Sequence, residues 1–299
     1  MDPDTCELTL AALYLGVRIE QARQATGWDL RAATGQELAV LRGLTGEGGT
    51  GMTTRREPDS GRLPLPRYVR PEGVHPPLRW PDYAATVTRA PAEPLVLLPQ
   101  HLTEVTGPLL GPGRVRESDA DLTRQHDGAP IGQRILVSGR VLDSDGRAVP
   151  EALVEIWQAN AAGRYRHPVD QWPAPLDPNF TGLGRTVTDS EGCYRFTTVK
   201  PGAYPWGNHD NAWRPAHIHF SLFGRAFTQR LVTQKYFPVD PLFPYDPIFN
   251  AIPDPRGRQR LTSSFDLEAT RPDWALAFRF DIVLRGREAT PFEAEVDGR

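Results

Sequence analysis

The sequence predicts an all-β protein, a β-sandwich with long inserted loops, which carries a short helical extension at its N-terminus. The 30 prolines and 27 glycines interrupt the chain of 299 residues at short intervals, a composition typical of strands joined by loops rather than of helices. Short runs of alternating apolar and polar residues, separated by turn sequences, follow one another in the second half of the chain. Together these observations favour a sandwich.

The first residues of the chain differ from the rest, because apolar side chains recur at helical spacing over residues 7–43 with almost no proline. We therefore predict one or two short helices in residues 1–51, the helical extension. The run at 53–61 is polar and follows a glycine-rich run, which is typical of a flexible linker, and we place this linker at residues 52–75. Residues 76–131 are predicted to form an extended, proline-rich arm with loops that runs over another surface.

The predicted sandwich domain comprises residues 132–290 and is assembled from short strands. The runs RILVSGRVL at 134–142 and EALVEIW at 151–157 flank an Asp-Gly turn, and we predict that they pair as a hairpin. A helix at 259–268 is a weaker prediction. Further strands are predicted at 193–199, 216–223, 228–233 and 275–284.

The overall charge and the cysteine count limit the function classes. With 34 basic and 37 acidic residues, the chain indicates neither nucleic-acid binding nor a polybasic membrane surface, so small-molecule chemistry is favoured. Cys6 and Cys193 are too few for a disulfide framework or a thiolate cluster, so a metal would need nitrogen and oxygen ligands. The sequence contains no apolar run of the roughly 20 residues that a membrane span needs. It shows no basic leader either, so we expect a cytoplasmic protein.

The sharpest local feature is the His217-Ile218-His219 sequence inside a predicted strand. Because side chains alternate across a strand, the two imidazoles share one face while Ile218 points to the other. Two neighbouring ring nitrogens on a rigid strand suit a metal ion. A bare His-x-His sequence is nevertheless more often a pair of surface or hydrogen-bonded histidines, so the motif alone does not decide the matter.

Two tyrosines occupy loop positions, where functional residues gather on a rigid sandwich. Tyr165 lies in GRYRH at the start of one loop, and Tyr204 lies in GAYPW just after a predicted strand. A phenolate is a hard, anionic oxygen donor that favours a hard ion such as Fe(III). Each tyrosine taken alone is also typical of a packed aromatic side chain with a hydrogen-bonded hydroxyl. Their spacing does not distinguish the two interpretations.

Four motifs occur in order along the chain: GRYRH at 163–167, DPNF at 177–180, KPGAYPW at 200–206 and WRPAHIH at 213–219. Together they resemble the intradiol ring-cleavage dioxygenases, and within that family the beta-subunit type that acts on protocatechuate. The resemblance extends from about residue 76 to 286. It implies a non-haem Fe(III) bound by two tyrosines and two histidines, which correspond to Tyr165, Tyr204, His217 and His219.

The resemblance also implies roles for the residues around the metal. Arg214 would lie beside it and stabilise charge that develops on the substrate, although a buried salt bridge is the simpler role. Tyr204 would leave the metal when the substrate binds and would take a catechol proton, and Gln234 would support these groups. The residues that match walls of the substrate pocket, and that are also explained by packing alone, are Tyr83, Trp206 and Ile248.

The implied reaction is Fe(III)-dependent cleavage of protocatechuate (3,4-dihydroxybenzoate) by O2, between its two hydroxyls, to 3-carboxy-cis,cis-muconate. This reaction belongs to the beta-ketoadipate pathway of aromatic catabolism. A homologous alpha subunit is the implied partner in a hetero-oligomer, because the family builds its active site at the subunit interface. Catechol and hydroxyquinol are alternative substrates. A non-catalytic sandwich subunit is disfavoured by the complete set of two tyrosines and two histidines, and a zinc hydrolase is disfavoured because zinc sites rarely use two tyrosines.

The helical extension lies outside this resemblance. Residues 1–51 instead resemble the C-terminal tail of a 3-oxoadipate CoA-transferase subunit, through Leu8-Thr-Leu, Gly16-Val and Ala25-Thr-Gly-Trp. The two enzymes serve one catabolic pathway, so a fusion of adjacent reading frames, or a true start at Met52, would explain the similarity. We expect the extension to be vestigial or not translated, and loosely attached to the rest.

Overall fold

The computed structural model describes residues 9–10, 31–32, 74–92, 115–207, 209–223 and 230–292. The chain divides into two units, residues 1–63 and 64–299. In the first unit the described residues form two short strands, β1 (Thr9–Leu10) and β2 (Arg31–Ala32), which pair in parallel. At Thr9 and Leu10 the predicted helix is therefore wrong, because pairing with a distant segment, which apolar spacing cannot report, sets the backbone there. The remainder of the predicted extension, and most of the predicted linker, lie outside the described residues.

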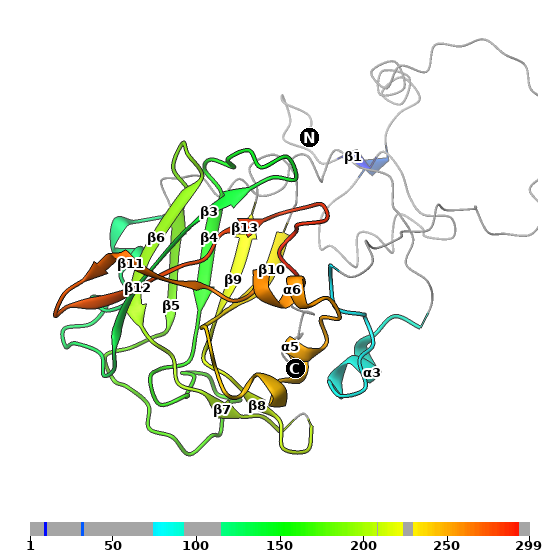
Figure 1. The fold of residues 1–299 in the computed structure, drawn as a ribbon, viewed down its shortest axis with the longest axis horizontal. Coiled ribbons are helices and arrows are strands. Elements are labelled where there is room, and N and C mark those ends of the chain that lie inside the picture. Colours follow the sequence, from blue (N-terminus) through cyan, green and yellow to red (C-terminus); the bar gives the residue numbers. More distant parts are fainter. Residues whose placement is uncertain are drawn as a thin grey trace, which may run out of the picture. The chain divides into compact units, whose positions relative to one another are not determined.

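Two large sheets form the body of the second unit and confirm the predicted all-β sandwich (Figure 1). The four-stranded sheet is antiparallel and has the order β10-β9-β4-β5. Its strands are β4 (Leu153–Trp157), β5 (Leu183–Val187), β9 (His217–Phe223) and β10 (Arg230–Tyr236). In the five-stranded sheet, β3 pairs with β6 on one edge and with β12 and β13 on the other. Its strands are β3 (Arg134–Leu142), β6 (Cys193–Val199), β11 (Ser264–Arg271), β12 (Ala275–Arg279) and β13 (Ile282–Val283).

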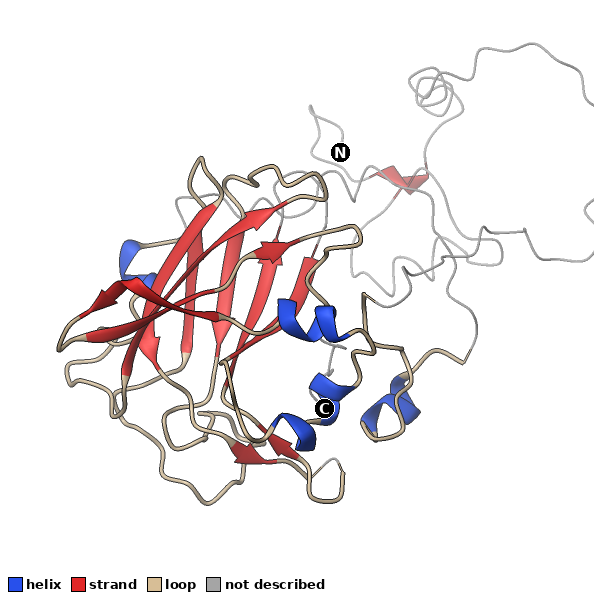
Figure 2. Cartoon of the chain, in the orientation of Figure 1, coloured by secondary structure: helices blue, strands red, loops and turns tan. Residues whose placement is uncertain are grey.

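The described helices are short and lie beside the sheets (Figure 2). They are α3 (Ala85–Arg89), α5 (Pro247–Asn250) and α6 (Pro255–Arg260), with the 3-10 turns η2 (Glu117–Ala120) and η3 (Phe243–Tyr245). Both α5 and α6 begin with the pair Asp-Pro. In each, the aspartate accepts a hydrogen bond from the backbone N–H two residues later, and proline fits the first helical position because it needs no donor there. None of the described helices has the length and apolar character to span a membrane.

The core between the sheets is built from alternate side chains of the strands. Ile218 and Phe220 on β9, and Val137 on β3, are almost completely removed from solvent. Each fully buried side chain of this size stabilises the fold by about 1.5–3 kcal/mol. The core therefore holds β9 rigidly, which matters because β9 also carries the two histidines.

Several local predictions differ from the structure. Residues 134–142 and 151–157 do not form a hairpin, because β3 pairs with β6 while β4 crosses to the other sheet and pairs with β5 and β9. Nearness in sequence favours a hairpin, but burial of both strands against separate partners decides the pairing. The predicted helix at 259–268 is instead α6 followed by the edge strand β11, in which Phe265, Leu267 and Ala269 alternate with polar residues and most side chains are exposed. The predicted strand at 275–284 is divided into β12 and β13.

The core contains a buried basic side chain. Lys235 on β10 is fully buried, with its Nζ 3.0 Å from the ring centroid of Phe237 and 4.7 Å from that of Phe278. Within the described ranges, no group accepts a hydrogen bond from this Nζ. Burial, reinforced by the charge of Lys200, lowers the pKa of Lys235 well below its ordinary value of 10.5. The charged amine is thus destabilising in the folded state.

Lys235→Met is predicted to stabilise the fold, and to do so more at low pH than at high pH. The unfolded chain keeps the amine protonated up to about pH 10.5, whereas the folded chain gives up this proton at a lower pH. The loss of folding stability caused by Lys235 is therefore complete at a pH below the pKa of the folded state. It disappears as the pH approaches 10.5. Methionine fills a similar volume without a charge. Each kcal/mol gained should raise Tm by about 2–4 °C.

Calorimetric Tm values between pH 6 and pH 10 would measure this effect. Lys200→Met is the comparison, because that amine is only partly buried and its removal should give a smaller gain. A rise in Tm for Lys235→Met that is the same at every pH would contradict the prediction.

Candidate metal centre

The two histidines of the His-x-His sequence point from β9 to the same face, as side-chain alternation predicts. Their Nε2 atoms lie 3.2 Å apart, and both rings are buried. Ile218 between them is buried in the core on the opposite face. Trp157, which is paired with His219 across β4 and β9, stacks on its ring at 4.7 Å between centroids and 6° between planes. The sheet therefore fixes both imidazoles.

The hydrogen bonds of His217 leave its Nε2 available to a metal. Its Nδ1 lies 2.6 Å from the backbone carbonyl oxygen of Pro215. A carbonyl oxygen can only accept, so Nδ1 carries the proton and Nε2 presents a lone pair to the cluster. Burial, followed by the charges of Arg214 and His219, holds the pKa of His217 well below its ordinary value of 6.5. The ring is therefore neutral, which is the form that binds metals.

The two tyrosines complete the cluster from separate loops. The Oη of Tyr165 lies 3.1 Å from Nε2 of His219, and the Oη of Tyr204 lies 3.4 Å from Nε2 of His217. The two phenol rings meet edge to face, with centroids 5.6 Å apart. The structure thus brings together the four residues that the sequence predicted as ligands.

Close backbone contact locks the two tyrosine loops together. Gly163 has a φ of 78°, and a Cβ added there would lie 2.3 Å from the carbonyl oxygen of Ala203. The backbone carbonyl of Asn160 accepts hydrogen bonds from both Gly163 N and Gly202 N. Only glycine fits such a position, since it has no Cβ and tolerates positive φ. Tyr165 lies two residues after Gly163, and Tyr204 lies one residue after Ala203. The contact between Gly163 and Ala203 therefore sets the distance between the two tyrosines.

The geometry of these four atoms fits a single bound metal ion. Neighbouring ligand atoms at about 2.0–2.2 Å from one ion are separated by about 2.8–3.6 Å at the usual coordination angles. The three distances of 3.1, 3.2 and 3.4 Å fall within that range. Two imidazoles and two phenol oxygens form a nitrogen and oxygen donor set suited to a hard, high-valent ion such as Fe(III). Elsewhere in the described part of the chain, no three His, Cys, Asp or Glu side chains gather in a way that would bind a metal.

A buried charged network lies next to the four candidate ligands. Arg214 stands opposite Tyr204 in the short antiparallel pair of β7 (Tyr204–Pro205) and β8 (Trp213–Arg214). It is 3% exposed, and its guanidinium donates to Oε1 of Gln234. Gln234 is itself the partner of His219 across β9 and β10. The predicted catalytic residues Arg214 and Gln234 are therefore in contact with each other and adjacent to the histidines.

The structure also places the predicted pocket residues. The rings of Tyr83 and Trp206 meet edge to face at 5.0 Å, and the guanidinium carbon of Arg214 lies 5.4 Å from the Trp206 ring centroid. Tyr83 belongs to the predicted arm and is buried, so the described part of this arm packs against the site loop. Ile248 is buried on α5, beside the network of Arg214. His167, by contrast, is exposed and accepts a hydrogen bond from Val169 N within its own loop.

Two residues of the network were not predicted from the sequence. Asp246 is completely buried, with both carboxylate oxygens 3.3 Å from Nε of Arg214. The hydroxyl of Tyr236 lies 2.7 Å from Oε1 of Gln234 and 3.0 Å from Oδ2 of Asp246. The Asp-Pro pair at 246–247 is a signal for a helix start, but it carries no information about the arginine that the aspartate meets.

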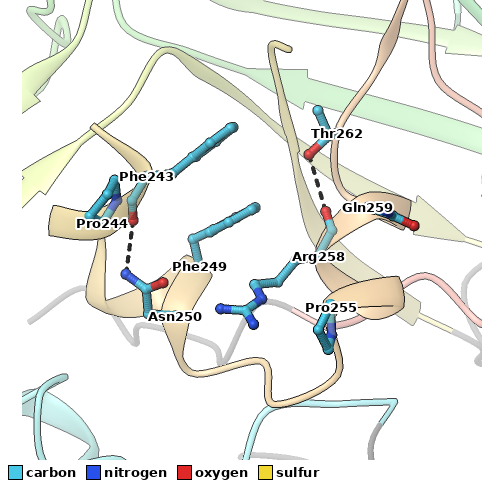
Figure 3. A pocket seen from close by; sticks show the side chains of 8 residues that line it. All are labelled: Phe243, Pro244, Phe249, Asn250, Pro255, Arg258, Gln259 and Thr262. Atoms are coloured by element: carbon cyan, nitrogen blue, oxygen red, sulfur yellow. Dashed lines mark hydrogen bonds between the residues drawn. The ribbon is translucent and has the colours of Figure 1, made fainter. Parts of the chain in front are cut away.

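A separate pocket of about 650 Å³ lies between α5 and α6 (Figure 3). Its lining includes none of the candidate ligands and consists of Phe243, Pro244, Phe249, Asn250, Pro255, Arg258, Gln259 and Thr262. The ring of Tyr236 packs against both Phe243 and Phe249, while its hydroxyl bonds the network of Arg214. The pocket is thus distinct from the metal centre.

Comparison with known proteins assigns the chain to a family. Residues 105–286 match the family described as dioxygenase, and residues 68–101 match the N-terminal region of the protocatechuate 3,4-dioxygenase beta subunit. The chain therefore belongs to the intradiol dioxygenase family, and it is an enzyme of that class.

Within the family, the similarity to a beta chain is high. The chain is 57% identical over 221 residues to the protocatechuate 3,4-dioxygenase beta chain of Burkholderia cepacia, over 73% of this chain and 94% of that one. It is 31% identical over 209 residues to the corresponding alpha chain of Pseudomonas putida, over 67% of this chain and 98% of that one. The solved structure of hydroxyquinol 1,2-dioxygenase from Pseudomonas putida DLL-E4 is 26% identical, covers 55% of this chain and 58% of that one, and gives a TM-score of 0.40.

His219→Ala is predicted to lower bound iron to the background level and to abolish ring cleavage. The substitution removes one of four donor atoms and leaves the ion under-coordinated. Metal analysis of the purified protein measures the first effect, and oxygen uptake measures the second. His167→Ala is the matched control, since this exposed histidine should be replaceable without loss of iron. Full iron content and full activity in His219→Ala would contradict the ligand assignment.

Proposed function

We propose that this chain catalyses Fe(III)-dependent intradiol cleavage of protocatechuate by O2, with the iron bound by Tyr165, Tyr204, His217 and His219. The observation that carries the proposal is the convergence of two phenol oxygens and two imidazole nitrogens at 3.1–3.4 Å beside a buried arginine. The choice of protocatechuate is supported by the similarity to a protocatechuate 3,4-dioxygenase beta chain. When bound, Fe(III) would supply a Lewis acid that draws electron density from the catechol ring.

Tyr204 is suited to accept a proton from the incoming catechol. Its oxygen lies further from its histidine partner than that of Tyr165, 3.4 Å against 3.1 Å, and it belongs to a strand of only two residues. As a phenolate, Tyr204 would be a base suited to accept a proton from a catechol hydroxyl. The loop of Tyr165 is held by the backbone N–H of Tyr165, which donates to Oδ2 of Asp170 at 2.7 Å.

Arg214 and Gln234 act on charge and orientation. A guanidinium fixed in a buried site stabilises negative charge on the ring without having to reorganise during the reaction. The Nε2 of Gln234 is buried and meets no acceptor within the described segments, so it is available to donate to a bound oxygen atom. Tyr83, Trp206 and Ile248 supply flat and apolar walls, which exclude water and orient the aromatic ring.

The proposed partner is a homologous alpha chain. The similarity to an alpha chain over 98% of its length indicates that the two chain types share one fold. The loop after Tyr165, one of the candidate ligands, exposes three large apolar side chains, Val169, Trp172 and Leu176. Exposed apolar side chains on an ordered loop are typical of an interface. An alpha chain bound there would supply part of the contact with the substrate carboxylate.

The function can be tested on the chain purified together with its alpha chain. The expected complex is red-brown from tyrosinate-to-Fe(III) charge transfer, takes up one O2 per protocatechuate and forms 3-carboxy-cis,cis-muconate, identified by mass spectrometry. Catechol and hydroxyquinol are the comparison substrates and should turn over more slowly. The chain without its partner should be poorly soluble or nearly inactive. A colourless or zinc-containing complex, or faster cleavage of catechol, would contradict the proposal.

Arg214→Ala is predicted to keep the iron and the colour but to slow turnover by on the order of 10²-fold, the scale of removing one preorganised charge stabiliser. Arg256→Ala is the matched control, because Arg256 also pairs with an aspartate, Asp254 at 3.2 Å, but on the surface. Turnover should be normalised to iron content. A normal rate for Arg214→Ala would reduce this arginine to a structural role.

A further inference from the structure

We propose that Asp246 is a positioning residue, which aims the Arg214 guanidinium at the reacting substrate and fixes the helix that carries Ile248. The inference rests on the proposed function, since it assigns Asp246 a task through Arg214. It concerns a residue that is neither one of the four candidate metal ligands nor one of the proposed wall residues.

The carboxylate of Asp246 makes two separate contacts, one with Arg214 and one with the backbone of α5. The two carboxylate oxygens both lie 3.3 Å from Nε of Arg214, so the negative charge faces one edge of the guanidinium. Oδ1 also accepts a hydrogen bond from Ile248 N at 2.9 Å and caps the first turn of α5. A shift of the carboxylate would therefore move both the arginine and the wall residue.

The remaining contacts of Arg214 complete the alignment. Its NH2 group donates to Oε1 of Gln234 and lies 3.3 Å from the Oη of Tyr236. The Tyr236 hydroxyl in turn lies 3.0 Å from Oδ2 of Asp246, which closes a ring of hydrogen bonds. The guanidinium is planar, so contacts on two of its edges fix both its position and its tilt. All four side chains are buried, which strengthens each electrostatic contact.

Charge makes Asp246 more than a helix cap. A buried guanidinium without a counter-ion is strongly unfavourable, so the aspartate allows Arg214 to stay charged where the substrate binds. The chain contains a comparison: Asp254 also precedes a proline and caps α6 by accepting from Arg256 N at 2.9 Å. Asp254 pairs with an arginine whose side chain is 76% exposed, whereas the partner of Asp246 is 4% exposed. The two residues share the capping role and differ in the charge that they hold.

The test is a double-mutant cycle on the iron-loaded complex with its alpha chain. Asparagine remains a good N-cap but has no charge. Asp246→Asn should therefore keep iron, colour and anaerobic protocatechuate binding within about threefold of wild type, while kcat falls by on the order of 10-fold or more. Asp246→Ala loses the cap as well, and should also raise KM. The matched change Asp254→Asn should leave kcat and KM unchanged.

The decisive measurement combines Asp246→Asn with Arg214→Ala. If Asp246 acts through Arg214, the double variant turns over no more slowly than Arg214→Ala alone. Rate losses that multiply independently, or a normal kcat in Asp246→Asn, would overturn the inference. Tyr236→Phe offers a second route if Asp246→Asn does not fold, because it opens the same hydrogen-bonded ring without changing charge. It should lower kcat several-fold, and a normal kcat would count against the inference.

The cycle also separates this inference from the proposed function. A complex without iron or ring cleavage, or a normal rate for Arg214→Ala, would refute the proposed roles of the ligands or of Arg214. A slow Arg214→Ala together with a normal Asp246→Asn would refute only the role of Asp246.

Discussion

The placement of His217 and His219 on one face of a buried central strand is the constraint on which the rest of the site depends. β9 lies between β4 and β10, and the side chain between the histidines is part of the core. Moving one imidazole would therefore require the core or two hydrogen-bonded strands to move, which packing at crystal-like density resists. The cross-strand neighbours follow from the same register, because Trp157 and Gln234 are the partners of His219. The strand thus defines a fixed point to which two loops must bring their tyrosines.

The buried polar side chains near His217 and His219 lie in two different environments. The network of Arg214, Gln234, Tyr236 and Asp246 is interconnected, so its charges compensate each other in a region of low dielectric constant. Lys235, the residue between Gln234 and Tyr236, points instead into the core and has two phenylalanine rings as neighbours. Alternation along β10 therefore sends adjacent polar residues into opposite environments. Only the network faces the candidate metal centre.

Much of the fold and of the site was predictable because the relevant signals are local. The strands at 134–142 and 193–199 were predicted with their observed bounds, and the strand at 216–223 agrees within a residue. The predicted hairpin was wrong because pairing is decided by which surfaces each strand buries, and that depends on distant segments. The edge strand β11 was missed although Phe265, Leu267 and Ala269 alternate with polar residues, because the predicted helix at 259–268 joined this segment to the short helix α6. Asp246 and Tyr236 were missed because their importance lies in the partner that each one meets.

The sequence by itself determined the kinds of donor atom, the alternation that puts both histidines on one face and the order of motifs that indicates the family. These are properties of residue type and of spacing along the chain, so they need no knowledge of packing. Only the tertiary structure decided that the loops of Tyr165 and Tyr204 meet through Gly163 and that the four donor atoms converge within 3.1–3.4 Å. It also decided that the aspartate capping α5 meets an arginine from β8. Such contacts join segments that are far apart in the chain, and the burial of the sandwich core is what brings them together.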